Sequence, residues 1–243
     1  MWRALLTALQ FLTILPVPRQ APAADHLLGR SLLCYPLVGA LLGGVLITVA
    51  AITQHTPPSL SAAIVLALWV ILTGALHLDG LADTADAWVG GLHDRDKTLA
   101  IMKDPCCGPV GVMALIVIAL LKWAALAVLL ADAQWAALIA APVLGRTLAV
   151  TLLATTPYAR PGGLGEQMAR HLPRHQAALI ITLTLVIILF ILPERHLALT
   201  LTTALTFWLT RTTLMRRLHG TTGDTTGALI ELTETTTLLT LAI

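Results

Sequence analysis

The chain has 243 residues, of which 57% are hydrophobic and 12% charged, and its formal net charge is +2. A soluble domain is about 45–50% apolar and about 25% charged, so these values exclude an ordinary soluble protein. The composition also excludes a disordered chain, the three cysteines exclude a secreted disulfide scaffold, and the small net charge excludes a nucleic-acid-binding protein. We therefore predict an all-α, polytopic integral membrane protein with no nucleic-acid partner.

The amino-terminal segment, residues 1–20, has leucines at helical spacing on one side. This pattern predicts an amphipathic interfacial helix that lies in, or dips into, the inner leaflet. A cleaved signal peptide is the alternative, because an apolar stretch follows Arg3 and leads to the small residues 21–23. Gln10 interrupts that stretch, and two prolines stand where it would approach a cleavage site, so we favour an uncleaved helix.

Seven further runs can each span the roughly 30 Å apolar core of a bilayer, which takes about 17–25 apolar residues. Val, Ile and Leu are continuous in these runs and do not alternate with polar residues, which favours helices over a transmembrane barrel. The last run fits least well because it contains Glu231 and Glu234. The runs are residues 35–53, 60–76, 110–130, 135–154, 177–192, 197–214 and 228–243.

Lys and Arg set the orientation, because short loops that carry them stay in the cytoplasm. With a cytoplasmic amino terminus, the outer loops contain only Arg195, so the charges support seven crossings. We therefore predict one membrane domain over residues 1–243, whose cytoplasmic face is formed by residues 77–111, 156–176 and 219–231. The inner segments contain Arg3, Arg19, Arg30, Arg95, Lys97, Lys103, Arg160, Arg170, Arg174, Arg211, Arg216 and Arg217.

Aspartates gather at the inner end of the second run, in residues 77–86 (HLDGLADTAD). Asp79, Asp83 and Asp86 stand at i, i+4 and i+7, which places their carboxylates on one face of a helix. Like charges this close repel unless a cation joins them, and Mg²⁺ binds a few carboxylates while it keeps sites for water and phosphate. Gly80 would allow a second helix or the substrate to approach. A solvated acidic helix end and the cation-coupling site of a transporter are the alternatives.

Two glycine-rich loops are predicted to lie on the same side of the membrane. In residues 101–111 (IMKDPCCGPVG), Asp104 could bind the metal, act as a base or only cap the next helix, and Gly108 could approach a phosphate. In residues 220–227 (GTTGDTTG), backbone N–H groups at a helix amino terminus could bind an anion, although simple capping is the alternative. The residues singled out in this second loop are Thr222, Gly223 and Asp224.

Three basic residues complete the set. Arg146 lies in the middle of the fourth run, where a charge is costly, so it should face the interior and pair with a carboxylate or a substrate phosphate. Lys122 could snorkel or pair internally. Arg160, in a loop with several glycines, could clamp a diphosphate or act only as a positive-inside anchor. Carboxylates, anion loops and arginines on one face indicate phosphoryl-group transfer at a membrane surface.

These residues resemble one family closely, the cobalamin synthases, over nearly the whole chain. The histidine-led aspartate motif of residues 77–86 is the most specific part of the resemblance. Ala75 and His219 depart from the pattern, because the family usually has glycine at both positions, but neither change removes a ligand. The other matching segments are residues 11–18 (FLTILPVP), 35–39 (YPLVG), 101–104 (IMKD) with Gly108 and Gly111, and 222–224 (TGD).

The resemblance implies an enzyme of the bacterial inner membrane, with its active site on the cytoplasmic face, that acts late in cobalamin (vitamin B12) biosynthesis. It would join adenosylcobinamide-GDP to α-ribazole, or to α-ribazole 5'-phosphate, and would release GMP together with adenosylcobalamin or its 5'-phosphate. Mg²⁺, with Mn²⁺ as a substitute, would bridge the diphosphate. A homo-oligomer, or an association with other late cobalamin-pathway enzymes, could also form.

On this basis each polar residue receives a hypothetical role. His77 is the weaker candidate for a base, since it lies on the opposite side of the helix from the aspartates and could be a hydrogen-bonded support. The alternatives are an enzyme like the CDP-alcohol phosphotransferases, which the absence of Ala-Arg after the Asp-Gly pair disfavours, and a cation-coupled transporter. The roles are metal binding by Asp79, Asp83, Asp86 and Asp224; catalysis by Asp104, Asp86 and His77; and substrate or phosphate binding by Arg146, Arg160, Gly80, Gly108, Thr222, Gly223 and Asp224.

Overall fold

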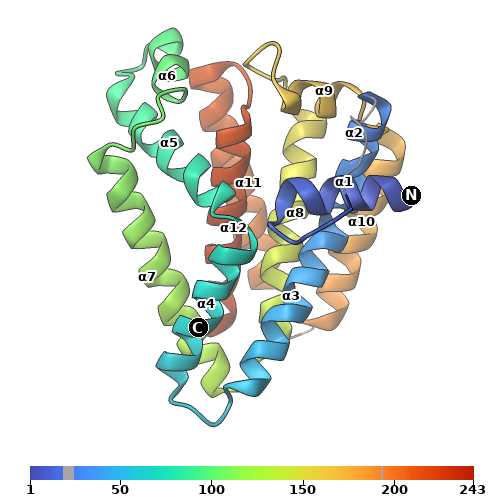
Figure 1. Cartoon of the computed structure of the whole chain (residues 1–243), viewed down its shortest axis with the longest axis vertical. Helices are drawn as coiled ribbons and strands as arrows, with labels where there is room; N and C mark the ends of the chain where they lie inside the picture. The colour runs from blue at the N-terminus through green and yellow to red at the C-terminus, as the bar shows by residue number, and fades with distance from the viewer. Residues whose placement is uncertain (19–24, 193) are drawn as a thin grey trace.

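The computed structural model describes residues 1–18, 25–192 and 194–243, and within these the chain is helical apart from loops and one isolated bridge between Tyr158 and Thr221. The long helices run along one axis of the molecule, and the short ones gather at one end (Figure 1). The helices are α1 (Trp2–Leu12), α2 (Asp25–Ser31), the 3-10 turn η1 (Leu32–Cys34), α3 (Tyr35–Ile52), α4 (Pro58–Leu72), α5 (Leu76–Gly90), α6 (Arg95–Ile101), α7 (Pro109–Ala131), α8 (Ala136–Thr155), α9 (Leu164–Arg170), α10 (Arg174–Ile191), α11 (His196–Leu218) and α12 (Gly223–Ala242).

The all-α prediction is confirmed, and each of the seven predicted runs forms a helix. Four helical segments are long and apolar enough to cross a membrane, and a fifth is added if α4 and α5, which are bent by 86° relative to each other, count as one span. Neither α11 nor α12 meets that test, and both are rich in threonine. The structure therefore supports a membrane protein with four or five such spans among the described residues, and seven crossings stay a prediction.

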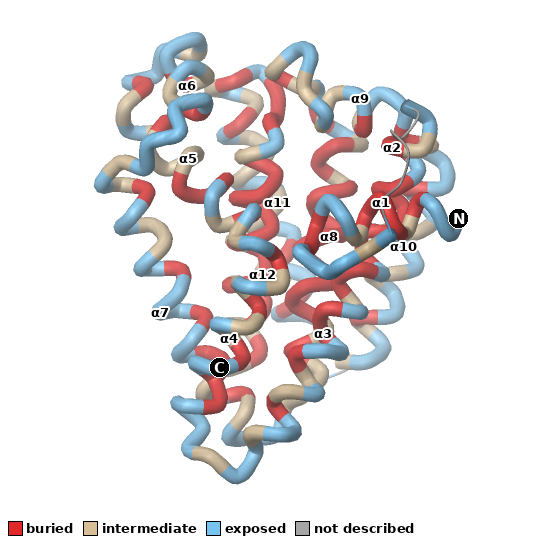
Figure 2. Tube along the Cα trace, viewed as in Figure 1, coloured by how far each residue is buried: buried red, intermediate tan, exposed pale blue. Residues whose placement is uncertain are grey.

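The core lies around α12, which packs against α5, α7, α8 and α11. In Figure 2 the tubes of α8 and α12 are largely buried, whereas most of α7 and α10 is exposed. Only 11% of the apolar window of α10 is buried inside the molecule, against 83% for α8. A helix that is apolar on its outer face needs an apolar solvent, so α7 and α10 present surfaces suited to lipid.

Threonine makes a polar helix such as α12 compatible with this central position. The hydroxyl of Thr233 donates to the carbonyl of Leu229 at 2.7 Å, and that of Thr235 donates to the carbonyl of Glu231 at 2.7 Å. Each hydroxyl thus finds its acceptor one turn back in the same helix and needs no partner elsewhere. Composition alone misleads here, because the low hydropathy of α12 comes largely from threonines whose hydroxyls are paired within the helix, although that of Thr237 has no partner.

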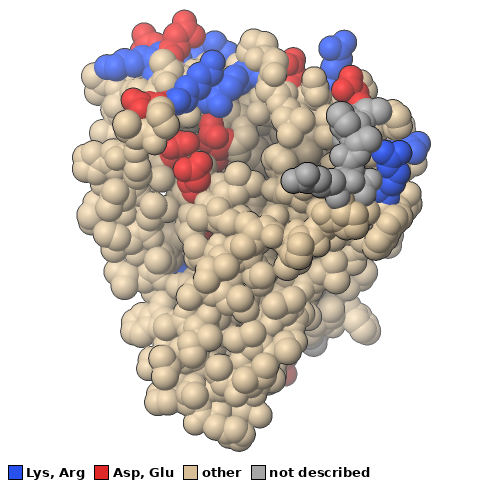
Figure 3. Space-filling view, in the orientation of Figure 1, with Lys and Arg blue, Asp and Glu red and all other residues tan. Residues whose placement is uncertain are grey.

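The amino-terminal segment forms a helix, α1, that ends at Leu12 and so covers only part of the predicted residues 1–20; it lies across the long axis and packs against α2 and α3 (Figure 1). Its place at a membrane interface stays a prediction. Its buried face includes Ala4, Ala8 and Leu12, while Trp2 is 68% exposed. Two parts of the sequence predictions lie outside the described residues. They are Arg19, one of the basic residues assigned to the cytoplasmic side, and residues 21–23, the small residues of the signal-peptide alternative. On the face drawn in Figure 3, most charged atoms gather at the end of the molecule that carries α6 and α9.

Candidate active site

A cavity of about 300 Å³ opens at the charged end, between α1, α5, α9 and the first turn of α12. Its wall combines the carboxylates of Asp79 and Asp224 with the guanidinium of Arg160, and His77 and Tyr158 also border it. Apart from Thr226 and Tyr35, the remaining wall consists of apolar side chains and glycines. Tyr158 was not singled out from the sequence, although its position two residues before Arg160 in the glycine-rich loop is a signal for it. The cavity therefore unites three separate motifs of the sequence.

A short backbone pairing brings the arginine loop to the start of α12. The N–H of Ala159 donates to the carbonyl of Thr221 at 2.8 Å, and the N–H of Thr221 donates to the carbonyl of Pro157 at 2.8 Å. As a result, Arg160 forms an ion pair with Asp224 at 3.1 Å, with both side chains about four-fifths buried. Arg160 is thus held at the cavity wall by a carboxylate, and a bound anion would compete for or share its guanidinium.

Burial shifts two titratable groups at this wall. It raises the pKa of the Asp224 carboxyl, an effect that Arg160 opposes and that the negative charge of Asp79 reinforces. Burial also raises the pKa of the Tyr158 hydroxyl. Two carboxylates whose charges act on each other in one cavity form a site that attracts a cation.

Thr222 caps α12, which is the alternative that the sequence left open. Its hydroxyl accepts from the N–H of Thr225 at 3.2 Å, and the Thr225 hydroxyl accepts from the N–H of Thr222 at 2.8 Å. This reciprocal capping box satisfies the end of the helix and orders Gly223 and Asp224 at the cavity. The contribution of Thr222 and Gly223 to phosphate binding stays a prediction.

Asp86 faces the amino terminus of α7. Its carboxylate accepts from the N–H of Gly108 at 2.7 Å and from the N–H of Gly111 at 2.9 Å. A Cβ atom on either glycine would collide with that carboxylate, which explains why both positions are glycine. In the structure, Gly108 therefore approaches a protein carboxylate, and Asp86 binds the positive end of a helix dipole.

The carboxylates do not form a ready-made metal cage. Among the described residues, no group of three or more His, Cys, Asp or Glu side chains converges closely enough to hold a metal ion. Asp104 accepts from the N–H of Cys106 at 3.0 Å in an exposed loop, so it organises a turn. Of the predicted metal ligands, Asp79 and Asp224 border the cavity, while Asp83 lies between Asp79 and Asp86 on α5.

Gly80 brings α5 against α12. A Cβ at this position would lie 2.7 Å from the carbonyl oxygen of Asp224 and 3.0 Å from its Cα. A Cβ at Gly227 would lie 3.3 Å from the Cα of His77, a looser but still tight approach, so glycines on both helices permit the contact. The sequence predicted that either a second helix or the substrate would approach Gly80, and the structure shows the second helix. This contact positions Asp79 and Asp224 on one wall of the cavity.

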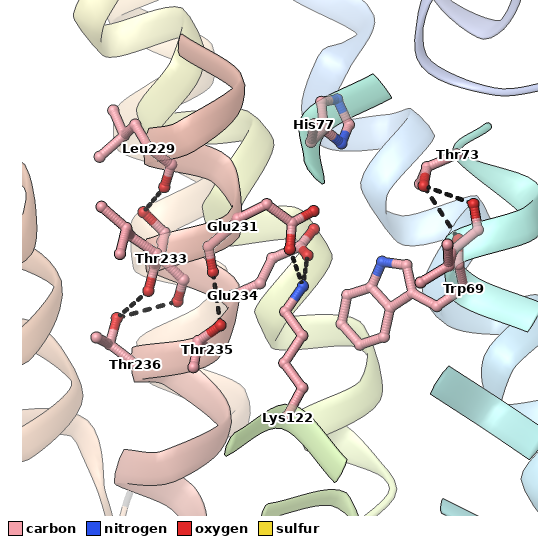
Figure 4. Close-up of polar contacts among 12 residues, drawn as sticks. Trp69, Thr73, His77, Lys122, Leu229, Glu231, Thr233, Glu234, Thr235 and Thr236 are labelled. Atoms are coloured by element: carbon pink, nitrogen blue, oxygen red, sulfur yellow. Dashed lines mark hydrogen bonds and ion pairs between the residues drawn. The ribbon is translucent and has the colours of Figure 1, made fainter. Parts of the chain in front are cut away.

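Behind the cavity lies a buried network of four charges. Lys122 donates to Glu231 and to Glu234, at 2.6 Å in each case, and stacks over the ring of Trp69 (Figure 4). Arg146 is fully buried and pairs with Glu234, which is the carboxylate partner expected as one of its two options. The two glutamates, which only weakened the last predicted span, were missed as partners. Their signal is that the last run contains two acids while the third and fourth runs each contain one base, since buried charges require pairing.

The two positions that depart from the family pattern both have left-handed backbone. Ala75, which precedes α5, has a φ of 56°, and His219, which ends α11, has a φ of 54°. Glycine adopts this region without strain, whereas other residues are disfavoured there. The glycines expected at these sites thus correspond to backbone geometry, and the site residues are unaffected.

The chain is similar to known proteins over nearly its whole length. Residues 4–242 match the family described as cobalamin-5-phosphate synthase. Proteins named adenosylcobinamide-GDP ribazoletransferase are similar to the chain: one from Pseudomonas aeruginosa strain PAO1 is 53% identical over 99% of this chain and 98% of that protein. One from Stutzerimonas stutzeri is 52% identical over 98% and 97%, respectively. No solved structure matches. The match covers the aspartate helix, the arginine loop and the capped end of α12, and the chain belongs to the cobalamin-5-phosphate synthase family.

Proposed function

We propose that this chain is an adenosylcobinamide-GDP ribazoletransferase, which joins adenosylcobinamide-GDP to α-ribazole or its 5'-phosphate and releases GMP. The observation that carries the proposal is sequence identity: about half of all positions are identical to those of proteins with that name, over nearly the full length of both chains. The cavity adds chemical support, because it combines an arginine with two carboxylates. A hydroxyl of the acceptor attacks the phosphate bonded to cobinamide, a new P–O bond forms, and the bond to GMP breaks.

The residues of the cavity divide this work between them. Arg160 neutralises phosphate charge as GMP leaves, and its ion pair with Asp224 keeps the guanidinium oriented before substrate binds. A carboxylate of the same set accepts the proton of the attacking hydroxyl. The apolar part of the wall excludes water, which would otherwise compete with the acceptor hydroxyl.

Asp79 and Asp224, which share the cavity wall, would hold Mg²⁺, and Asp83 on the same helix as Asp79 would add negative charge nearby. The donor set fits this ion, because Mg²⁺ is commonly bound by one or two carboxylates that act together with substrate phosphates, and needs no cage of three protein ligands. When bound, the ion neutralises charge on the diphosphate. The gathering of charged groups at the end with α6 and α9 supports a cytoplasmic active site at the bacterial inner membrane (Figure 3).

Release of GMP by the purified protein in detergent or liposomes tests the proposal. We expect release from adenosylcobinamide-GDP only when α-ribazole or its 5'-phosphate is present, its loss on chelation of divalent ions, and its recovery with Mg²⁺. Release without an acceptor would indicate hydrolysis, and no release from a folded preparation would contradict the transferase function. Activity that survives chelation would contradict the role given to the metal.

A further inference from the structure

His77 borders the cavity with a ring nitrogen that has no partner. The residue is 3% exposed and shares the cavity wall with Asp79 and Arg160. Its Nε2 atom makes no hydrogen bond within the described part of the chain. A buried polar nitrogen is costly unless something bonds to it, and the cavity is the space beside His77 that a ligand could enter. The unpaired atom therefore indicates a contact that substrate completes.

The other ring nitrogen determines what Nε2 can do. The Nη2 atom of Arg146 lies 3.4 Å from Nδ1 of His77. A guanidinium has only donors, so Nδ1 must be the acceptor and cannot carry a proton. In a neutral imidazole the proton then resides on Nε2, which becomes a donor.

The contact with Arg146 also requires a neutral ring. A protonated imidazole carries a proton on each nitrogen, so its Nδ1 would direct a donor toward the donors of the guanidinium. Arg146 is held in place by its ion pair with Glu234, and both side chains are fully buried. The form that fits this geometry is therefore the neutral tautomer with Nε2–H.

We propose that His77 donates a hydrogen bond from Nε2–H to a phosphate oxygen of the activated substrate, and that Arg146 and Glu234 are positioning residues that hold the imidazole in this tautomer. A phosphate oxygen is the acceptor that fits, because Arg160 on the same wall also attracts an anion. This inference rests on the proposed function. It makes His77 a fixed donor, in place of the base considered from the sequence.

Two substitutions of His77 test the contributions of its two ring nitrogens separately. In His77→Gln the amide nitrogen reaches the position of Nε2 and can still donate, whereas His77→Asn keeps an acceptor near Nδ1 but does not reach Nε2. We expect His77→Gln to retain most of kcat/KM for GMP release, and His77→Asn to lose about 10- to 100-fold, as for a hydrogen bond to a charged group. Equal losses in two variants that elute and melt like the wild type would overturn the proposal.

The tautomer itself is measured by NMR on the full-length protein labelled with ¹⁵N-histidine, with His77→Gln used to assign the signals. We expect His77 to carry its proton on Nε2, and inorganic pyrophosphate with Mg²⁺ to shift that nitrogen. Arg146→Met should allow the second tautomer to appear. A proton on Nδ1 in the wild type, or an unchanged Nε2 signal at saturating pyrophosphate, would overturn the proposal. Absence of GMP release by the wild type would instead refute the proposed function. The NMR measurement would still determine the tautomer of His77, so the two failures can be told apart.

Discussion

Ala75 and His219 hold backbone conformations in which a Cβ atom crowds the following carbonyl oxygen. Such a residue costs about 1–2 kcal/mol relative to its normal region, whereas glycine avoids the cost. Neither side chain belongs to the cavity wall. The strain is therefore a local property of the turns that precede α5 and follow α11.

The first prediction concerns this strain. Ala75→Gly should raise the free energy of unfolding by about 1 kcal/mol, because relief of the left-handed strain exceeds the added chain entropy. Thermal unfolding in detergent measures the change. As a control, Ala63→Gly in the exposed face of α4 should destabilise by about 1 kcal/mol, since its backbone is already helical. A fall in melting temperature for Ala75→Gly would contradict the interpretation.

Two aspartates of the same stripe should respond differently to the same substitution. Asp79→Asn changes a carboxylate at the cavity and should reduce kcat by about 10²-fold or more with little change in melting temperature. Asp86→Asn weakens the contact with the amino terminus of α7 and should destabilise by about 0.3–2 kcal/mol. GMP release and thermal unfolding of both variants separate the two roles. A large stability loss in Asp79→Asn with normal kcat would reverse the assignment.

At the scale of elements, the contact of α5 with α12 decides where the carboxylates lie. The sequence predicts the aspartate face of α5 and the acidic start of α12 separately, but says nothing about their separation. Gly80 and Gly227 let the two helices approach, and this close contact places Asp79 beside Asp224. The site therefore depends on two residues that have no side chain.

Gly80→Ala tests that dependence. The added Cβ would meet backbone atoms of Asp224, which cannot move aside as a flexible side chain could. We expect a destabilisation of about 1–3 kcal/mol by overpacking, together with a loss of GMP release. Gly44→Ala is the matched control, because a Cβ there meets nothing within 4 Å, and it should be neutral or stabilising. Equal melting temperatures and activities for the two variants would contradict the role of the contact.

At the scale of the whole molecule, charges from α7, α8 and α12 meet in one buried network. Lys122→Met should destabilise by about 3–5 kcal/mol, because it leaves two buried glutamates with one arginine. The double variant Lys122→Met with Glu231→Gln should recover part of the lost stability, since the positive charge of Arg146 then balances the negative charge of Glu234. Thermal unfolding compares both with Lys103→Met, an exposed control that should resemble the wild type. A single variant as stable as the double would refute the pairing.

The sequence by itself determined the properties that depend on neighbouring residues in the chain. Continuous apolar runs predicted α3, α7, α8 and α10, and the spacing of the aspartates predicted their common face on α5. The motifs also pointed to the family that the comparisons establish. These features are local because a helix repeats every 3.6 residues, so its faces can be read directly from spacing.

Only the tertiary structure decided which of these groups meet. Arg146 had two candidate partners in the sequence, and the packing of α8 against α12 provides Glu234. Asp86 turns to the start of α7, while Asp79 and Asp224 share a cavity with Arg160. Such pairings depend on how helices distant in the chain pack, and a carboxylate has the same local pattern whether its partner is a helix end, an arginine or a substrate.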